Sequence, residues 1–199
     1  FIDKITEFLQ ILPESKVLDL ACGRGRHSYY LSQKGLDVTG LDISPKSIET
    51  AIERYENKNL DFYIHDMRNP FRTNFFDYIF NFFTSFGYFK KLKENQEVFS
   101  AIHKGLKPGG RAMIDFMNVE KVIANIVDRE TKEIKGISFY IRRQIEDGFI
   151  KKIIKVDDGK KISLFKEEVQ ILKPFHFYQM IQEEGFKLVK EFGDYQLKP

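Results

Sequence analysis

Strand-like and helix-like segments alternate along the first two thirds of the chain, and this alternation constrains the fold more than any other feature. Short apolar runs are separated by segments whose apolar residues recur every three or four positions. The strand-like runs are 16–21, 36–41, 60–65, 76–83 and 111–117. Because strand–helix–strand units make right-handed crossovers between parallel strands, the pattern predicts a doubly wound, mostly parallel α/β sheet of the Rossmann-like type.

The pattern changes after Asn118. Apolar and polar residues nearly alternate in 137–145, 149–156 and 162–172, and Asp147-Gly148 joins the first two of these runs. Asp-Gly between strand-like runs is a strong hairpin signal. We therefore expect 118–173 to form an inserted helix and a small antiparallel β ribbon. The main domain is then 1–117 with 174–199, in which 174–184 is expected to be a helix and 186–195 a strand.

The composition is typical of a globular protein. The 199 residues are 42% hydrophobic and 31% charged, and a net charge of +3 is too small to indicate nucleic-acid binding. The single cysteine, Cys22, excludes an internal disulfide and favours a reducing compartment. No signal peptide or membrane-spanning run is recognisable, although the chain begins at Phe1 and not at Met. These features predict a cytoplasmic protein with no membrane partner.

The first strand-like run ends in two glycines, in the sequence VLDLACGRGR (17–26). Glycines between a strand and a helix allow the backbone to approach a ligand closely. In a doubly wound sheet, ligands bind at the carboxyl ends of the strands. Asp42 stands at such an end, 19 residues after Gly23, where a carboxylate can bind both hydroxyls of a ribose. The ligand is therefore expected to contain a nucleoside.

Two features distinguish between nucleoside cofactors. A dinucleotide-binding turn has a third glycine in G-x-G-x-x-G, and this chain has Ser28 at that place. Asp19 also puts a carboxylate at the turn, which would repel a pyrophosphate but attract an ammonium or sulfonium group. The residues favour a cationic cofactor over a dinucleotide.

In their order along the chain, these motifs resemble those of the class I S-adenosylmethionine-dependent methyltransferases. The resemblance rests on 19–25, on Asp42 in VTGLDIS, on His65-Asp66-Met67, on 76–89 and on 105–118. It covers roughly residues 1–117 and 174–195, and is nearest to bacterial small-molecule methyltransferases with an antiparallel insertion after the fifth strand. It implies in-line methyl transfer to a small-molecule N, O or C acceptor. S-adenosylhomocysteine would be the product, and no metal is implied.

The resemblance also implies where the cofactor binds. Asp19, Ala21 and Gly23 would face the methionine end. Asp42 and Ile43 would face the ribose, and Asp66 and Met67 the adenine. The insertion would roof the acceptor pocket. The expected cofactor-binding residues are Asp19, Ala21, Cys22, Gly23, Gly25, Asp42, Ile43, Asp66, Met67 and Phe82.

Each of these residues also has a simpler interpretation. The glycines can serve tight packing between strand and helix, and Cys22 is more simply a small packed side chain than a nucleophile. His27 and His176 are the candidate proton acceptors, but a structural role is simpler for either. No pair of histidines has the spacing of a zinc site. Phe82, Phe83, Phe86 and Tyr88 are candidates for an apolar acceptor pocket or for contact with the sulfonium.

Two alternatives remain open. Lysines 151, 152, 155, 160 and 161 would suit an RNA or protein methyltransferase, although they are more simply a solvated face. The segment Asn81-Phe82-Phe83-Thr84 lacks the Asn/Asp-Pro-Pro-aromatic signature of amino-directed nucleic-acid methyltransferases, which argues against methylation of an adenine or cytosine amino group. The fold also suits a cofactor-binding module without turnover. A monomer or a homodimer is expected, and the acceptor is not determined.

Overall fold

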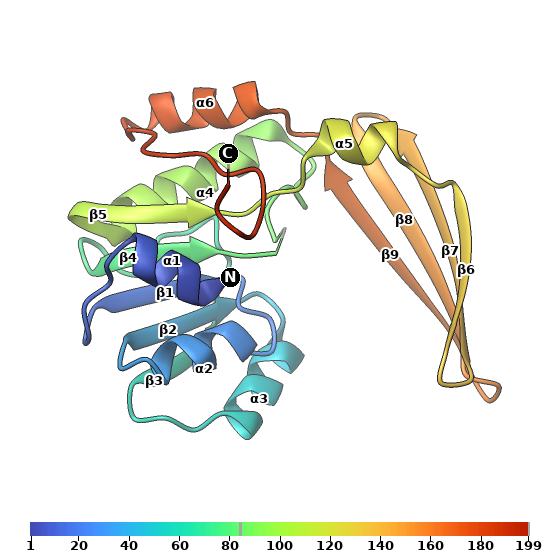
Figure 1. Cartoon of the computed structure of the whole chain (residues 1–199), viewed down its shortest axis with the longest axis horizontal. Helices are drawn as coiled ribbons and strands as arrows, with labels where there is room; N and C mark the ends of the chain where they lie inside the picture. Colours follow the sequence, from blue (N-terminus) through green and yellow to red (C-terminus); the bar gives the residue numbers. More distant parts are fainter. Residues whose placement is uncertain (84, 199) are drawn as a thin grey trace.

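A computed structural model describes residues 1–83 and 85–198 of the chain (Figure 1). A five-stranded sheet is covered by helices, and a second, four-stranded sheet projects from it. Thr84, which belongs to the predicted fourth-strand motif, and Pro199 lie outside the described residues. The predicted α/β class with an antiparallel insertion is confirmed.

The larger sheet has the order β3-β2-β1-β4-β5, and all its pairs are parallel. Its strands are β1 (Lys16–Leu20), β2 (Asp37–Asp42), β3 (Leu60–Ile64), β4 (Phe76–Asn81) and β5 (Leu106–Ile114). The order reverses beside β1, which pairs with β2 on one side and with β4 on the other. A crevice at the carboxyl ends of β1 and β4 is the usual ligand site of such a sheet.

Helices lie on both faces of this sheet (Figure 1). They are α1 (Ile2–Phe8), α2 (Arg26–Ser32), α3 (Pro45–Arg54), α4 (Leu92–Gly105) and α6 (Pro174–Glu183). Because successive strand residues point to opposite faces, Leu18 packs in one core cluster with residues of α4 and α6. Val17 packs in another cluster with residues of α1 and α2. Both faces of β1 are therefore buried, as expected for a central strand of a parallel sheet.

The insertion consists of one helix and four antiparallel strands. These elements are α5 (Val119–Ala124), β6 (Arg129–Ile134), β7 (Ile137–Glu146), β8 (Phe149–Asp157) and β9 (Ile162–Gln170). Asp147 and Gly148 join β7 to β8 with φ of 53° and 80°, as a type I′ turn requires. The sheet is attached to the core at Gln170, whose backbone N–H donates to the carbonyl of Gly87 at 2.7 Å.

The strand predicted for 186–195 is wrong. Within the described residues this segment makes no ladder with β5, and the two instead face each other across a groove of about 750 Å³. Two aromatic residues hold the segment in place. Phe186 packs edge-on against Phe99 of α4, and Phe192 packs edge-on against Phe8 of α1. The apolar residues that suggested a strand therefore attach the segment to two helices on opposite faces of the sheet.

Gly40, in the middle of β2, provides a test of this packing. It lies opposite Phe62 of β3, and a Cβ at Gly40 would stand 2.6 Å from Cδ1 of Phe62. Gly40→Ala should lower the free energy of unfolding by about 1–3 kcal/mol, the usual cost of overpacking. Phe62→Leu makes room for the added methyl group. The double variant, measured by chemical denaturation, should therefore be more stable than the sum of the single changes predicts. Strict additivity would contradict this packing.

Candidate functional site

The turn between β1 and α2 forms the centre of the candidate site. Ala21, Gly23 and Gly25 have φ of 62°, 57° and 78°. For Ala21 this left-handed conformation is strained, because it favours glycine, and strained backbone often occurs at functional sites. The turn 21–25 directly follows the carboxyl end of β1.

The two glycines of the turn serve different purposes. A Cβ at Gly25 would lie 2.5 Å from Cζ of Phe62 and 2.9 Å from Cβ of Ala51, so Gly25 is needed for packing against β3 and α3. A Cβ at Gly23 would have no heavy atom within 4 Å. The packing role that the sequence left open therefore belongs to Gly25, whereas Gly23 borders open space.

Asp42 connects the end of β2 to this turn. Its Oδ2 accepts the backbone N–H of Gly23 and its Oδ1 accepts that of Ser44, both at 2.8 Å. Gly23 and Asp42, which are 19 residues apart in the sequence, are thus in direct contact. A carboxylate has about four lone-pair sites, so acceptor capacity remains for the hydroxyls of a ligand. The neighbouring Ile43 side chain is 65% exposed and offers an apolar surface beside Asp42.

Asp19 lies buried beneath the turn. Its side chain is 2% exposed, and the hydroxyl of Ser28 donates to its Oδ2 at 2.6 Å. Burial raises the pKa of Asp19 to about 6, with a smaller upward contribution from the charge of Asp42, while the Ser28 hydrogen bond opposes the rise. A cation brought to the turn would favour the ionised carboxylate. Ser28, singled out only as the residue replacing a third glycine, is therefore the partner that orients Asp19.

Burial also determines the chemistry of Cys22. It raises the pKa of the Cys22 thiol, and the charges of Asp19 and Asp42 raise it further. A thiol that stays protonated is a poor nucleophile. The Sγ atom instead fills space beside Gly40, which is consistent with a packed side chain.

Asp66, after β3, is held by a neighbouring guanidinium. It accepts the backbone N–H of Arg68 at 3.0 Å and the Nη2 of Arg68 at 2.5 Å, and Nη1 of Arg68 donates to Glu94 of α4 at 2.6 Å. The Arg68 hydrogen bonds hold the pKa of Asp66 below its ordinary value. An adenine amino group at Asp66 would therefore share this carboxylate with Arg68.

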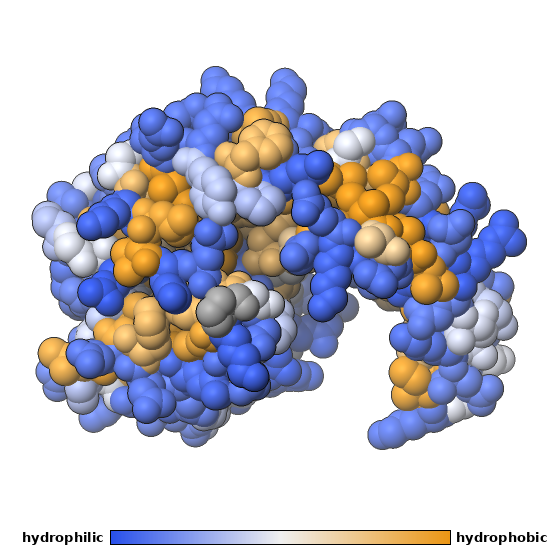
Figure 2. Space-filling view, turned by 45° about the horizontal axis from the view of Figure 1, so that its top comes forward, coloured by the Kyte–Doolittle hydropathy of each residue, from blue (hydrophilic) through white to orange (hydrophobic). Residues whose placement is uncertain are grey.

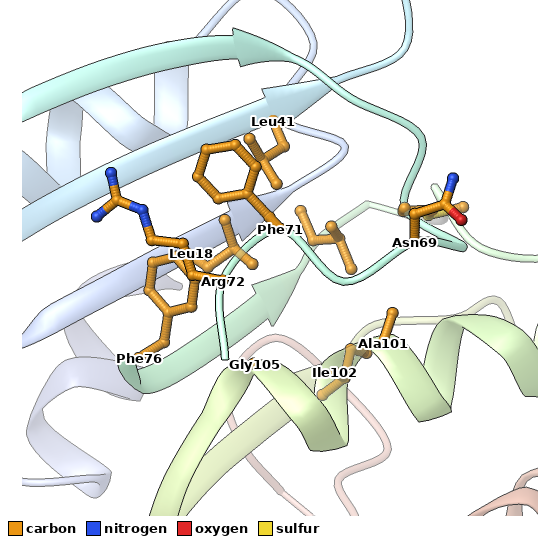
Figure 3. A pocket seen from close by; sticks show the side chains of 11 residues that line it. Leu18, Leu41, Asn69, Phe71, Arg72, Phe76, Ala101, Ile102 and Gly105 are labelled. Atoms are coloured by element: carbon orange, nitrogen blue, oxygen red, sulfur yellow. The ribbon is translucent and has the colours of Figure 1, made fainter. Parts of the chain in front are cut away.

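Met67 lies on the other side of this loop, against the core. It lines a narrow pocket whose walls include Leu18, Leu41 and Phe71, shown in Figure 3. The pocket lies between the loop after β3 and helix α4, and its lining is apolar except for Asn69 and Arg72. It contains neither of the carboxylates at the glycine turn, so it is a gap in the core and not part of the candidate site.

The end of β4 contributes a buried amide. Asn81 donates its Nδ2 to the carbonyl of Leu20 at 2.7 Å, while its Oδ1 is buried and has no partner among the described residues. An unpaired buried acceptor is costly, so this oxygen suits a donor supplied by a ligand. Phe82, expected at the cofactor, is instead buried in the core, where it stacks with Phe80. The exposed ring at this position is that of Phe83.

An aromatic cluster lies beside the end of β4. The rings of His27 and Phe83 stack with centroids 4.6 Å apart, and Tyr195 packs against Phe83 at 5.6 Å. Asp115, just after β5, joins the cluster because its Oδ2 accepts the backbone N–H of Phe83 at 2.8 Å and the hydroxyl of Tyr195 at 3.1 Å. Sequence reasoning missed Asp115 and Tyr195. The position of Asp115 at the end of a strand was the available signal.

The two candidate proton acceptors differ in their surroundings. Burial, together with the charge of Arg26, lowers the pKa of His27 to about 4, so its ring is neutral at pH 7. Its Nε2 is 2.9 Å from the guanidinium of Arg26. The Nδ1 of His176 accepts the backbone N–H of Lys173 at 2.9 Å at the start of α6. His176 therefore caps a helix, and His27 is the histidine that lies near the glycine turn.

Two of the ribbon lysines are paired with carboxylates of the same sheet. Lys151 pairs with Glu146 at 2.5 Å and Lys152 with Glu167 at 3.1 Å. In the described residues, no group of three or more His, Cys, Asp or Glu side chains is placed to hold a metal ion. None of the helices within 1–83 and 85–198 has the length and apolar character needed to cross a bilayer.

Comparison with known proteins gives consistent matches. A family model described as "Methyltransferase domain" matches residues 17–110. An uncharacterized methyltransferase of Synechocystis, sll0829, is 38% identical over 107 residues, covering 52% of this chain and 48% of that protein. The dTDP-3-amino-3,4,6-trideoxy-alpha-D-glucopyranose N,N-dimethyltransferase of Streptomyces venezuelae is 25% identical over 168 residues, which cover 81% of this chain and 70% of that protein.

The fold also matches solved structures. A crystal structure of an S-adenosylmethionine-dependent methyltransferase from Clostridium acetobutylicum superimposes with a TM-score of 0.86 at 20% identity, covering 99% of this chain and 82% of that one. At this identity the likeness concerns the fold. The chain spans about half the length of the first curated relatives that it matches.

The burial of Asp19 predicts a pH dependence of stability. Because its pKa is raised from 3.8 to about 6, the folded protein keeps a proton that the unfolded chain has already released between these values. The free energy of unfolding should therefore fall as the pH rises through this interval. Asp19→Asn carries no proton to lose and can still accept the Ser28 hydroxyl. Its stability relative to the unsubstituted protein should rise by on the order of 3 kcal/mol between pH 4 and pH 7. The free energies of unfolding of both proteins can be measured by urea denaturation at each pH. If they changed equally with pH, the burial of the Asp19 carboxyl would be contradicted.

Proposed function

We propose that this chain, whose residues 17–110 match a family model for a methyltransferase domain, is a class I S-adenosylmethionine-dependent methyltransferase that transfers a methyl group to a small-molecule acceptor. One observation carries the proposal. The strained turn 21–25 borders open space at Gly23, is hydrogen-bonded to Asp42, and has the ionisable Asp19 buried beneath it.

The residues present fit this cofactor. Bound at the turn, it supplies a methyl group on a sulfonium, which is already activated for transfer. Asp42 offers the ribose hydroxyls the acceptor capacity left beside Gly23 and Ser44. Asp19 favours a positively charged ligand over a pyrophosphate. The unpaired Oδ1 of Asn81, at the end of β4, offers an acceptor to an N–H or O–H of a ligand.

The other residues expected to contact the cofactor have different roles in this proposal. Ala21 and Gly23 shape the turn, whereas Gly25 and Cys22 are packed behind it. Ile43 presents its exposed side chain next to the ribose-binding carboxylate. Asp66 contributes to adenine binding only as far as Arg68 leaves its oxygens available. In place of Phe82, the Phe83 ring is the aromatic wall at this end of the sheet.

For the acceptor side, the aromatic cluster around Phe83 is the candidate wall, and the insertion 118–173 is the candidate roof. A cluster of flat rings with one carboxylate suits a compact acceptor, and the name of the Streptomyces relative supports a small molecule. Holding the acceptor in line with the methyl group contributes about 7–11 kcal/mol in well-aligned reactions. His27 is neutral at pH 7, but its Nε2 faces Arg26, so the contacts favour a wall role over that of a base.

Thermal unfolding with S-adenosylhomocysteine tests the proposal. At a concentration 100-fold above its dissociation constant, a ligand of the folded state stabilises the protein by about 2.7 kcal/mol. Gly23→Ala places a methyl group in the open space beside the turn and should abolish most of this stabilisation. An increase in the unfolding temperature with NAD, together with no increase with S-adenosylhomocysteine, would contradict the assignment.

Gly159→Ala is the matched control. Gly159 has a φ of 79° and, like Gly23, no heavy atom within 4 Å of an added Cβ, but it lies in the turn between β8 and β9. Both variants therefore carry similar backbone strain, and only Gly23→Ala should lose the response to the ligand. A protein that binds the cofactor but forms no S-adenosylhomocysteine with any member of an amine, hydroxyl and carbon-acid panel would be a binding module and not an enzyme.

A further inference from the structure

The glycine turn has charged side chains of both signs around it. The carboxylates of Asp19 and Asp42 form no ion pair within residues 1–83 and 85–198, and neither do the guanidinium groups of Arg24 and Arg26. Arg68, after β3, already binds two carboxylates. Because a site and its ligand have complementary charges, unpaired groups of both signs suit a ligand that carries both signs.

The side chain of Arg26 lies over the end of β4, although the residue is exposed. Its Nη2 is 2.9 Å from Nε2 of His27, and its guanidinium lies over the ring of Phe83, 6.0 Å from the centroid. His27 itself stacks on Phe83. Since Phe83 follows β4, the guanidinium reaches from the turn after β1 to the end of the neighbouring strand.

The Phe83 ring beneath Arg26 is held in a fixed place. Phe83 has a φ of 58°, a left-handed conformation that is strained for a bulky residue. The carboxylate of Asp115 accepts its backbone N–H at 2.8 Å. Strained backbone persists only where its surroundings hold it, and it occurs preferentially at ligand sites. The two rings therefore form a platform that holds Arg26 at the ligand end of the sheet.

Arg26 and Asp42 lie on opposite sides of β1. The sheet order is β2-β1-β4, Asp42 ends β2, and Arg26 contacts the residue that follows β4 at Phe83. In S-adenosylmethionine the carboxylate stands at the end of the methionine chain, away from the ribose. With the ribose at Asp42, the methionine chain crosses the turn toward β4, and its carboxylate comes to the side on which Arg26 lies.

We propose that Arg26 binds the amino-acid carboxylate of the cofactor, an inference that rests on the proposed function. A guanidinium has five N–H donors in a planar fork that matches the two oxygens of a carboxylate. His27 occupies only one nitrogen of this fork, so donors remain for a ligand. Arg26 thereby distinguishes a nucleoside with an amino-acid chain from one without its carboxylate.

The ligand end of the sheet is accessible. The arrows of β4 and β5 point toward the projecting sheet in Figure 1, and Figure 2 shows open space between that sheet and the main domain. A ligand can therefore reach the end of β4 without displacing the core. Because water reaches the exposed Arg26 as well, its ion pair is weaker than a buried one.

Isothermal titration calorimetry of the full chain with two nucleosides tests the proposal. S-adenosylhomocysteine has the carboxylate, whereas its decarboxylated analogue, S-adenosyl-3-thiopropylamine, keeps the amine and lacks the carboxylate. The unsubstituted protein should bind S-adenosylhomocysteine about 10-fold more tightly than the analogue, as expected for one hydrogen bond between charged groups. Arg26→Met should lose this preference and bind both compounds with about equal affinity.

Arg24→Met is the matched control. It removes an equal charge from an exposed arginine of the same turn, so it should keep the preference of about 10-fold. Arg26→Lys keeps the charge but not the planar fork, and it should keep part of the preference. Binding of the analogue by each variant shows that its site is folded.

Three results would overturn the inference while the proposed function stands. The first is an unsubstituted protein that binds both compounds equally. The second is a preference that Arg26→Met leaves unchanged, as when Arg26 serves an acidic acceptor instead. The third is an equal loss of preference in Arg24→Met and Arg26→Met, which would indicate a long-range effect of charge and not a contact. If the unsubstituted protein binds neither compound, the proposed function itself fails.

Discussion

The hydrogen bond from the Gly23 N–H to Asp42 is the contact on which the candidate site depends. It exists because β1 and β2 are parallel neighbours in register, so that their carboxyl ends lie side by side. Parallel pairing places the turn after β1 and the acid after β2 at one point. The carboxylate of Asp42 and the open backbone turn thereby become one candidate site, although 19 residues separate Asp42 from Gly23.

Electrostatics then determines which ligand this site suits. Asp42 lies near enough for its charge to contribute to the raised pKa of Asp19, and neither carboxylate forms an ion pair within the described part of the chain. Asp66, by contrast, is neutralised by Arg68. The carboxylates at the glycine turn therefore have no paired cation, whereas Asp66, after β3, shares the guanidinium of Arg68 with Glu94. Such a distribution favours a ligand whose positive charge lies toward the turn.

The loop after β4 joins the site to the insertion. Phe83, at its start, is held by Asp115 and stacks on His27, and Gly87 binds the end of β9 through its carbonyl. The same short segment thus contacts the aromatic cluster and the base of the projecting sheet.

The sequence by itself determined most of the strands and helices of the core, the parallel character of its sheet, the Asp147-Gly148 hairpin and the position of Asp42 opposite the glycine turn. These features follow from local periodicity, from turn residues with one favourable conformation, and from the geometry shared by all doubly wound sheets. Only the tertiary structure distinguished Gly23 from Gly25, placed Arg68 on Asp66, brought Asp115 to Tyr195 and left 186–195 without strand pairing. Each of these features depends on which residue, distant in the sequence, lies opposite in the fold. A pattern of apolar residues indicates that a side chain is buried, but it does not indicate which residue it packs against.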